Sequence, residues 1–292
     1  MIDLILSILF FTVILILFKL FERYRVDNFQ AIIINYIVAG SCGYFMLESP
    51  PSFSELMELD WIPFAMIIGL FFIVVFNLLA TGAQKVGLAV STIANKMSVI
   101  LPVVASFLLY DDDITVLKVS GIMLALVGVF LSSVEKGKLS FDKQYLWIIL
   151  IIFFGQGIAD IIFNYAQQTH VSNEESPLFF AVLFYAAFIS GLVLIGFQVM
   201  RKKEKILPLK KLGRNALWGI AVGIPNYLTL FFFFQALESG YFESSQAYPI
   251  LNMGVIVLSA LSGWIIFKEK LNVLNWLGIL ISIFAIGALS LG

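Results

Sequence analysis

The sequence predicts an all-α membrane protein in which ten transmembrane helices form two inverted five-helix repeats around a central cavity. Composition, the length of the apolar runs and an internal duplication all favour this fold class. Of 292 residues, 61% are hydrophobic and 13% charged, whereas a soluble domain has roughly 45–50% apolar and about 25% charged residues. Too few polar residues remain to cover a soluble domain, and the net charge of -1 argues against a nucleic-acid partner.

Apolar runs of about 20 residues, the length at which a helix crosses a bilayer, are bounded by charged residues, Pro or Asn/Gly clusters. They lack the alternating polarity of barrel strands, so each is predicted to be a helix. The runs cover residues 2–20, 31–47, 61–84, 87–110, 115–134, 145–167, 177–199, 213–237, 241–267 and 273–291. Because the first run opens with Asp3 and no small-residue cleavage site follows, we expect a retained helix rather than a signal peptide.

The basic residues predict an orientation. Sixteen of the eighteen Lys and Arg residues lie in or beside loops that follow odd-numbered runs, and seven of them fall between Arg201 and Arg214. The loops after even-numbered runs are acidic instead. Since basic loops stay in the cytoplasm, we expect a multi-pass protein of the cytoplasmic (inner) membrane with both termini outside.

A small-residue pattern repeats along the chain, and this indicates a duplication. Ala83, Gly87 and Ser91 recur 153 residues later as Ala236, Gly240 and Ser244. Gly121, Ala125 and Gly128 recur at an offset of 157 as Gly278, Ser282 and Ala285. We therefore predict a first repeat over 1–134, a connecting loop over 135–144 and a second repeat over 145–292. With five helices per copy, the second copy is inverted in the membrane, a construction that in transporters places the substrate near the midplane.

The duplicated segments resemble the ten-helix EamA type of the drug/metabolite transporter superfamily. The pieces are "AQKVGLAVSTIANKMSVILPVVASFLLYDDDI", followed by "GIMLALVGVFL", and "ALESGYFESSQAYPILNMGVIVLSALSGWIIFKEKL", followed by a final Gly-rich run. Each copy has a small-residue helix, an apolar helix with a Pro or polar break, a short turn and a last helix. The resemblance covers essentially the whole chain and implies transport, while it leaves the substrate open. The resemblance also implies that both termini lie in the cytoplasm, whereas the charges of the loops predict that both lie outside.

Lys96 is the main candidate for a binding residue. It is the tenth residue of the fourth run, about 14 Å into the membrane at 1.5 Å per residue, and its side chain is too short to reach an interface. The ammonium therefore needs a partner, water or a ligand anion. The repeat mate is Asn252, which is expected at similar depth, and together the two could hold a carboxylate or phosphate. "KMSVILP" also resembles the fourth helix of the sugar-phosphate and nucleotide-sugar branches.

The alternative is a structural role for Lys96, either in an ion pair or as a lysine that desolvation keeps neutral. Asp160 is the one acidic residue well inside a predicted helix, about 10 Å nearer the outer face by the predicted run limits at 1.5 Å per residue. If protons drive transport, Asp160 or Lys96 is expected to titrate during the cycle.

Other polar residues inside predicted helices are further candidates for the cavity. Gln156, Asp160, Asn164 and Gln167 recur every three or four residues and form one stripe. Pro225 can break the eighth helix beside two polar residues, or only kink it. The remaining candidates for substrate binding are Asn77, Asn226, Tyr227 and Tyr248. No catalytic residue, metal ligand or cofactor is predicted.

The leading function is secondary transport of a small polar metabolite, anionic or zwitterionic, such as an amino acid or a phosphorylated or carboxylated compound, by alternating access. Protons are a possible coupling ion, and a monomer or weak dimer in the lipid bilayer is expected to suffice. The chain has no G-x-x-x-x-G-K-[ST] loop for ATP. The alternatives are a drug or cation exporter of the same family and a channel or accessory subunit, although no filter sequence is visible. An intramembrane enzyme is the remaining alternative, and the sequence lacks the constellation of acid–base residues that it would need.

Overall fold

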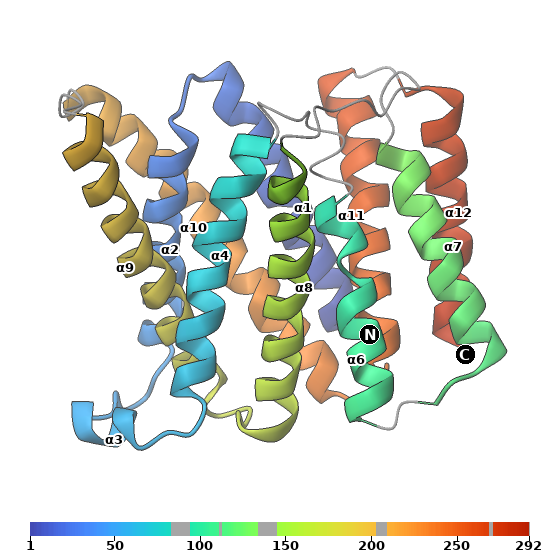
Figure 1. The fold of residues 1–292 in the computed structure, drawn as a ribbon, viewed down its shortest axis with the longest axis horizontal. Helices are drawn as coiled ribbons and strands as arrows, with labels where there is room; N and C mark the ends of the chain where they lie inside the picture. The colour runs from blue at the N-terminus through green and yellow to red at the C-terminus, as the bar shows by residue number, and fades with distance from the viewer. Residues whose placement is uncertain (83–93, 111–112, 134–144, 203–208, 269–270, 292) are drawn as a thin grey trace.

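The computed structural model describes residues 1–82, 94–110, 113–133, 145–202, 209–268 and 271–291, and every regular element in these ranges is a helix (Figure 1). The helices are α1 (Ile2–Arg23), α2 (Asn28–Phe45), α3 (Phe53–Met57), α4 (Ile62–Gly82), α6 (Ile100–Leu109), α7 (Val116–Ser133), α8 (Leu146–Thr169), α9 (Ser176–Lys202), α10 (Leu209–Glu238), α11 (Ser244–Phe267) and α12 (Val273–Leu291).

Within the described ranges, seven helices are long and apolar enough to cross a membrane, namely α1, α4 and α8 to α12. Two shorter apolar helical stretches, Ala94–Leu109 and Val116–Leu131, lie among them. The short α3 falls in a predicted loop. The protein is therefore an all-α membrane protein, as the composition predicted, and nine of the ten predicted runs correspond to one long helix each.

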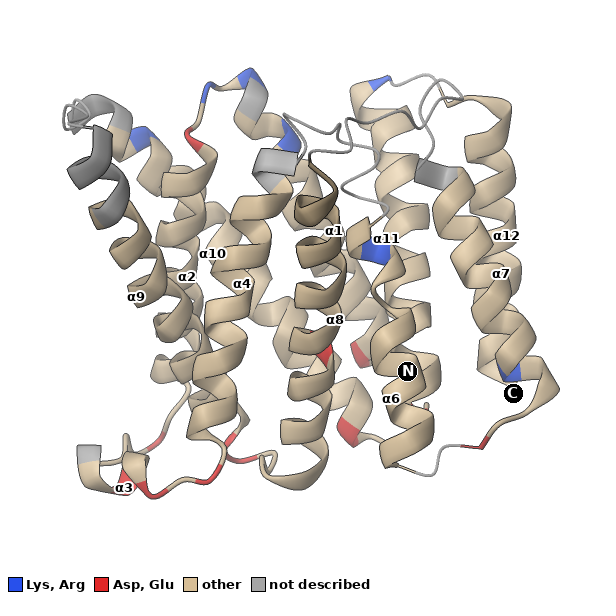
Figure 2. Cartoon of the chain, in the orientation of Figure 1, with Lys and Arg blue, Asp and Glu red and all other residues tan. Residues whose placement is uncertain are grey.

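Most of the basic residues and most of the acidic residues lie at opposite ends of the helix bundle (Figure 2). One end, called the basic end below, carries Arg23, Arg25, Arg214 and Lys268, and there the Arg214 guanidinium donates to the Arg25 carbonyl at 2.5 Å. The opposite end, called the acidic end, carries residues such as Glu55, Glu174, Glu238 and Glu243. Both α1 and α12 have their terminus-proximal ends at the acidic end (Figure 1).

The fourth predicted run, over 87–110, is helical where it is described, with one local irregularity. Residues 87–93 lie outside the described ranges. A helical turn over 94–97 leads through Ser98 and Val99 into α6, which begins at Ile100, and the Val99 backbone keeps a helical conformation. Pro102 has no N–H for the Ser98 carbonyl, so Leu101 donates to that carbonyl instead, at 2.9 Å. This tighter turn comes two residues after Lys96.

Pro225 does not break its helix. It lies inside α10, which runs without interruption from Leu209 to Glu238. One turn later, the Thr229 hydroxyl donates to the Pro225 carbonyl at 2.8 Å. Of the two possibilities left open by the sequence, the helix break is wrong.

Close helix contacts depend on small residues, most clearly between α7 and α12. A methyl group added at Gly128 would lie 2.5 Å from the Ser282 hydroxyl and 3.2 Å from the Gly278 carbonyl. The backbones can approach this closely only because no side chain separates them, as is usual where lipid supplies no hydrophobic drive between helices. Of the two predicted small-residue patterns, the one in α7 and α12 thus lies at a helix contact. Ala83, Gly87 and Ser91 of the other lie outside the described ranges.

The helices pack in a regular order around the centre of the bundle. α2 contacts α9 and α10, α4 contacts α8 and α9, and α1 contacts α10 and α11. α6 contacts α8 and α11, and α7 contacts α11 and α12. The segment that carries Lys96 is consequently enclosed by α1, α8 and α11, which supply the residues of the site described next.

Candidate functional site

The Lys96 side chain meets an aromatic ring and an amide in the middle of the bundle. Its ammonium lies 4.6 Å from the centroid of the Phe11 ring of α1 and 3.5 Å from Asn252 Oδ1 of α11. Among the described residues, no carboxylate oxygen lies within 4 Å of this ammonium. The structure thus brings Lys96 and its repeat mate Asn252 together, but through a long hydrogen bond.

A second set of amides lies beside Lys96. Asn95 Nδ2 donates to Gln156 Oε1 of α8 at 3.2 Å, and Gln156 Nε2 donates to Asp160 Oδ1 at 3.0 Å. These four side chains are all half-buried. Asp160 therefore joins the Lys96 region through Gln156 rather than through a direct ion pair.

Depth in the bundle can be read from the contact between α8 and α11. The Ser244 hydroxyl donates to Asn164 Oδ1 at 3.0 Å, which fixes the register of these two antiparallel helices. Gln156 lies eight residues before Asn164 and Asn252 eight residues after Ser244, so both lie at one level. Asp160 is one turn, about 6 Å, nearer the acidic end. The predicted run limits placed Asp160 about 10 Å nearer the outer face than Lys96. The direction of that displacement agrees with the structure, but its size is too large.

Tyr248 closes the polar residues into a ring. Its hydroxyl donates to the Asp160 carbonyl at 2.9 Å, and its own carbonyl accepts from Asn252 Nδ2 at 3.0 Å. The ring runs from Lys96 through Asn252, Tyr248, Asp160 and Gln156 to Asn95, which is next to Lys96 in the chain. We call these six residues, with Phe11, the Lys96 cluster.

The chemistry of the Lys96 cluster favours an anion. An ammonium has three N–H donors, and the only hydrogen bond from Lys96 to a described residue is the one to Asn252. The face of Phe11 offers a cation weaker compensation than a carboxylate does. A carboxylate or phosphate of a ligand can take the remaining donors, while the amides of Asn95 and Asn252 supply neutral hydrogen bonds around it.

Aromatic side chains pack on the acidic side of the Lys96 cluster. Phe163 of α8 packs with Phe180, Phe233 and Phe234, and the Phe233 ring meets the Tyr248 ring edge to face at 4.9 Å. All five rings are at most 4% exposed. On this side of the cluster, the helices α8 to α11 are therefore joined by a tightly packed group of aromatic rings.

Five of the predicted candidates lie outside the cluster. Gln167 is buried and donates through Nε2 to Glu238 Oε2 at 3.0 Å. Asn164 is buried and bonds Ser244. Asn226 Nδ2 donates to Asn35 Oδ1 at 3.0 Å and thereby joins α10 to α2. The Tyr227 hydroxyl contacts Met46 Sδ at 3.0 Å, and its ring is 1% exposed. Asn77 of α4 is half-buried.

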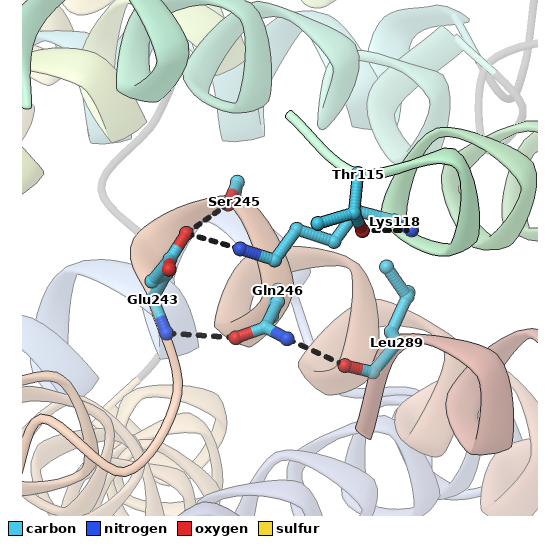
Figure 3. Close-up of polar contacts among 6 residues, drawn as sticks. All are labelled: Thr115, Lys118, Glu243, Ser245, Gln246 and Leu289. Atoms are coloured by element: carbon cyan, nitrogen blue, oxygen red, sulfur yellow. Dashed lines mark hydrogen bonds and ion pairs between the residues drawn. The ribbon is translucent and has the colours of Figure 1, made fainter. Parts of the chain in front are cut away.

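An ion pair between a buried lysine and a partly exposed glutamate lies at the acidic end (Figure 3). Lys118 Nζ of α7 lies 2.6 Å from Glu243 Oε2, just before α11, and the lysine is 2% exposed. The Glu243 N–H donates to Gln246 Oε1, and Gln246 Nε2 donates to the Leu289 carbonyl of α12 at 2.7 Å. This chain of contacts joins α7, α11 and α12.

Phe11 and Asn95 belong to the Lys96 cluster but are not among the residues predicted from the sequence. Phe11 is one of 29 phenylalanines and carries no signal of its own. Asn95 does, because an amide directly beside a lysine in an apolar run is itself costly to place in lipid. The Lys118–Glu243 pair joins two residues near the starts of the predicted runs over 115–134 and 241–267.

Comparison with known proteins gives a consistent result. Residues 145–291 match the sequence model of the EamA-like transporter family. An uncharacterized protein of Haemophilus influenzae is 28% identical over an alignment of 292 positions, which covers 97% of this chain and 96% of that protein. A crystal structure of a protein at 14% identity has the same fold, with a TM-score of 0.75 over 99% of this chain and 96% of that one. The family match spans half of the chain, and the protein belongs to the EamA-like transporter family of the drug/metabolite transporter superfamily.

Proposed function

We propose that the protein is a secondary transporter that moves a small anionic or zwitterionic metabolite by alternating access, with the Lys96 cluster as its substrate site. The observation that carries this proposal is the Lys96 ammonium, which lies in the middle of the bundle against Phe11 and Asn252 without a described carboxylate within 4 Å. A charge placed there without function would be expensive.

The proposal includes a ten-helix architecture of two inverted repeats. Its support is the pattern of helix contacts, whose strongest pairs are nearly symmetric between the two halves of the chain. The symmetry pairs α1 with α8, α2 with α9, α4 with α10, α6 with α11 and α7 with α12. Under this exchange the contact of α2 with α10 becomes that of α9 with α4, and the contact of α1 with α11 becomes that of α8 with α6. Contacts of α2 with α9, α6 with α11 and α7 with α12 map onto themselves.

Asp160 is the proposed proton carrier. It is half-buried, lies one turn from the level of Lys96 and is hydrogen-bonded by Gln156. An acid in this place can release its proton when the substrate changes the field around Lys96. We also infer a monomer or weak dimer as the working unit, because the Lys96 cluster draws all of its residues from one chain.

Thermal unfolding of the purified protein tests the site. A panel of carboxylated, phosphorylated, zwitterionic and cationic metabolites would be measured with wild type, Lys96→Gln and Lys96→Arg, and with Lys268→Gln as the control for loss of an exposed charge. A ligand at 100 times its dissociation constant stabilises by about 2.7 kcal/mol. We expect an anionic or zwitterionic compound to stabilise wild type and Lys268→Gln but not Lys96→Gln.

Counterflow in liposomes then tests transport. The stabilising compound should exchange saturably with wild type and not with Lys96→Gln. Equal stabilisation of wild type and Lys96→Gln by every active compound would overturn the proposed role of Lys96. A cation that binds through Asp160 would favour the drug or cation exporter instead.

A further inference from the structure

Two side-chain amides lie in series next to Asp160. Asn95 Nδ2 donates to Gln156 Oε1 at 3.2 Å, and Gln156 Nε2 donates to Asp160 Oδ1 at 3.0 Å. Gln156 and Asp160 are four residues apart on α8 and therefore share one face. A methyl group added at Gly157 would clash with Leu101 of α6, so α8 closely approaches the segment that carries Asn95. We call Asn95, Gln156 and Asp160 the amide relay.

The direction of the hydrogen bonds in the amide relay depends on the charge of Asp160. An ionised carboxylate only accepts hydrogen bonds, so Gln156 must turn its Nε2 toward the carboxylate and its Oε1 toward Asn95. Asn95 then has to present its Nδ2 to Gln156. Asn95 Oδ1 is thereby turned away from Gln156, and among the described residues it receives no hydrogen bond.

The same relay can run in the opposite direction. A protonated carboxyl group has an O–H donor, and Gln156 accepts from it after its amide has rotated to present Oε1. Gln156 Nε2 then donates to Asn95 Oδ1, and Asn95 presents its Nδ2 on the other side. The terminal torsions of Asn and Gln are broad and roughly two-fold, so rotation exchanges the oxygen and nitrogen positions at low cost.

The titratable groups that face Asp160 belong to two neighbouring segments, within the part of the chain that the structure describes. Lys96 lies one turn nearer the basic end, and the Tyr248 hydroxyl of α11 donates to the Asp160 carbonyl at 2.9 Å. α4 and α6 also pack on α8 but contain no titratable residue. On α10, Glu238 bonds Gln167 closer to the acidic end. The charge of Asp160 is therefore felt by Lys96 directly and by Asn95 through the amide of Gln156.

We propose that Gln156 and Asn95 are positioning residues that make anion binding at Lys96 depend on a proton on Asp160. This rests on the proposed transport function, because it concerns the same site. When Asp160 has taken up a proton from water, Asn95 presents an N–H to the anion beside the Lys96 ammonium. When Asp160 is ionised, Asn95 presents an oxygen, which repels the anion. The anion and the proton therefore bind together and move in the same direction, each favours binding of the other, and the proton returns to water when the anion leaves.

Infrared difference spectroscopy tests the amide relay without a ligand. The full chain in phosphatidylcholine nanodiscs would be titrated with acid. Asp160→Asn identifies the C=O band of the protonated Asp160 carboxyl by removing it, and Asn95→Leu does the same for the amide band of Asn95 in protein with ¹³C-labelled asparagine. We expect the Asn95 band to shift at the pH at which the Asp160 band appears, because both amides rotate when the carboxyl becomes a donor.

Two matched substitutions on α8 separate the amide relay from the charge of Asp160. Gln156→Met keeps an unbranched side chain but not the amide, so Asp160 still titrates while the Asn95 band should no longer follow it. Gln167→Met makes the same change in a glutamine that bonds Glu238 outside the cluster and should leave both bands unchanged. An Asn95 band that ignores the titration of Asp160, or follows it equally in Gln156→Met, overturns the relay.

Anion affinity gives a second readout, with acetate and sulfate as probes because both stay ionised at neutral and mildly acidic pH. Thermal unfolding of wild type, Gln156→Met and Lys96→Gln would give the affinities over the same pH range. Wild-type affinity should fall as pH rises. Part of that fall comes from the charge of Asp160, which Gln156→Met retains. The relay adds about tenfold, the value of one hydrogen bond to a charged group, so the fall should be about tenfold smaller in Gln156→Met.

The two readouts distinguish failure of the amide relay from failure of the substrate site. Anion binding that depends on Lys96 but falls equally with pH in wild type and Gln156→Met would leave the substrate site standing and overturn the relay. Anion binding that is the same in wild type and Lys96→Gln would refute the substrate site and, with it, the control of that site by the proton, even if the Asn95 band follows Asp160.

Discussion

At the scale of single residues, the unusual feature is a lysine held by a ring and an amide. A lysine in the interior of a protein normally meets a carboxylate, whereas Lys96 meets Phe11 and Asn252. No described carboxylate lies within 4 Å of this ammonium, and among the described residues it donates one hydrogen bond. Asn252 should consequently matter more for an anionic ligand than for the stability of the fold.

Substitutions of two asparagines should separate an effect on ligand affinity from an effect on the free energy of unfolding. Asn252→Ala removes the amide beside Lys96, and we expect it to weaken binding of the anion found with wild type about five- to tenfold, the value of about one hydrogen bond. Asn226→Ala is the matched control, because it removes an amide pair outside the cluster and leaves Asn35 buried without its partner. It should cost about 1–3 kcal/mol of unfolding free energy and leave affinity unchanged. Calorimetry and chemical unfolding would measure the two quantities, and the reverse pattern would contradict this assignment.

At the scale of elements, the Lys118–Glu243 pair joins α7 to α11. Glu243→Gln leaves the buried ammonium of Lys118 without its carboxylate, and since Glu243 is itself 36% exposed, we expect a loss of about 1–3 kcal/mol rather than the full value of a buried pair. Glu174→Gln, an exposed acidic residue at the same end, should change stability by less than about 0.5 kcal/mol. Thermal unfolding in one detergent compares them.

A double substitution tests whether the stability lost with Glu243 comes from the unpaired charge of Lys118. Because an ion pair can often be replaced by uncharged residues without loss, Lys118→Met combined with Glu243→Gln should recover most of the stability lost by Glu243→Gln alone. A double variant that is less stable than the single one would show that the lysine has another role.

Two glycines test the contact of α7 with α12. Gly128→Ala puts a methyl group 2.5 Å from the Ser282 hydroxyl, so we expect it to destabilise by about 1–3 kcal/mol. Gly287→Ala in α12 has no atom within 4 Å and should instead stabilise slightly, by up to about 1 kcal/mol, because alanine is the better helix former. Equal effects in unfolding measurements would refute the close contact.

Sequence reasoning located elements better than it located interactions. The apolar runs predicted α1, α2, α4 and α7 to α12 because length and hydrophobicity decide which segments can enter a bilayer. They could not predict the turn at Ser98, since Pro102 is apolar and a run count does not register a missing N–H. The predicted duplication pointed to Asn252 as the partner of Lys96. Nothing in the sequence pointed to Phe11, because only the packing of the helices distinguishes it from the other phenylalanines.

At the scale of the whole molecule, the two ends differ in charge (Figure 2). Because basic loops stay in the cytoplasm, we expect the basic end inside and both termini outside. Alkaline phosphatase fused after residue 292 should be active, and green fluorescent protein fused at the same place should stay dark in a bacterial secretion assay. The opposite result would reverse the orientation.

The contact between Lys96 and Asn252 joins residues 156 positions apart, and this has a consequence for biosynthesis. At 5–20 residues per second, the ribosome produces Asn252 about 8 to 30 s after Lys96. During that interval Lys96 can have its Phe11 contact, but not the amide that α11 supplies. The surroundings of this lysine are therefore completed only when the later part of the chain has been made.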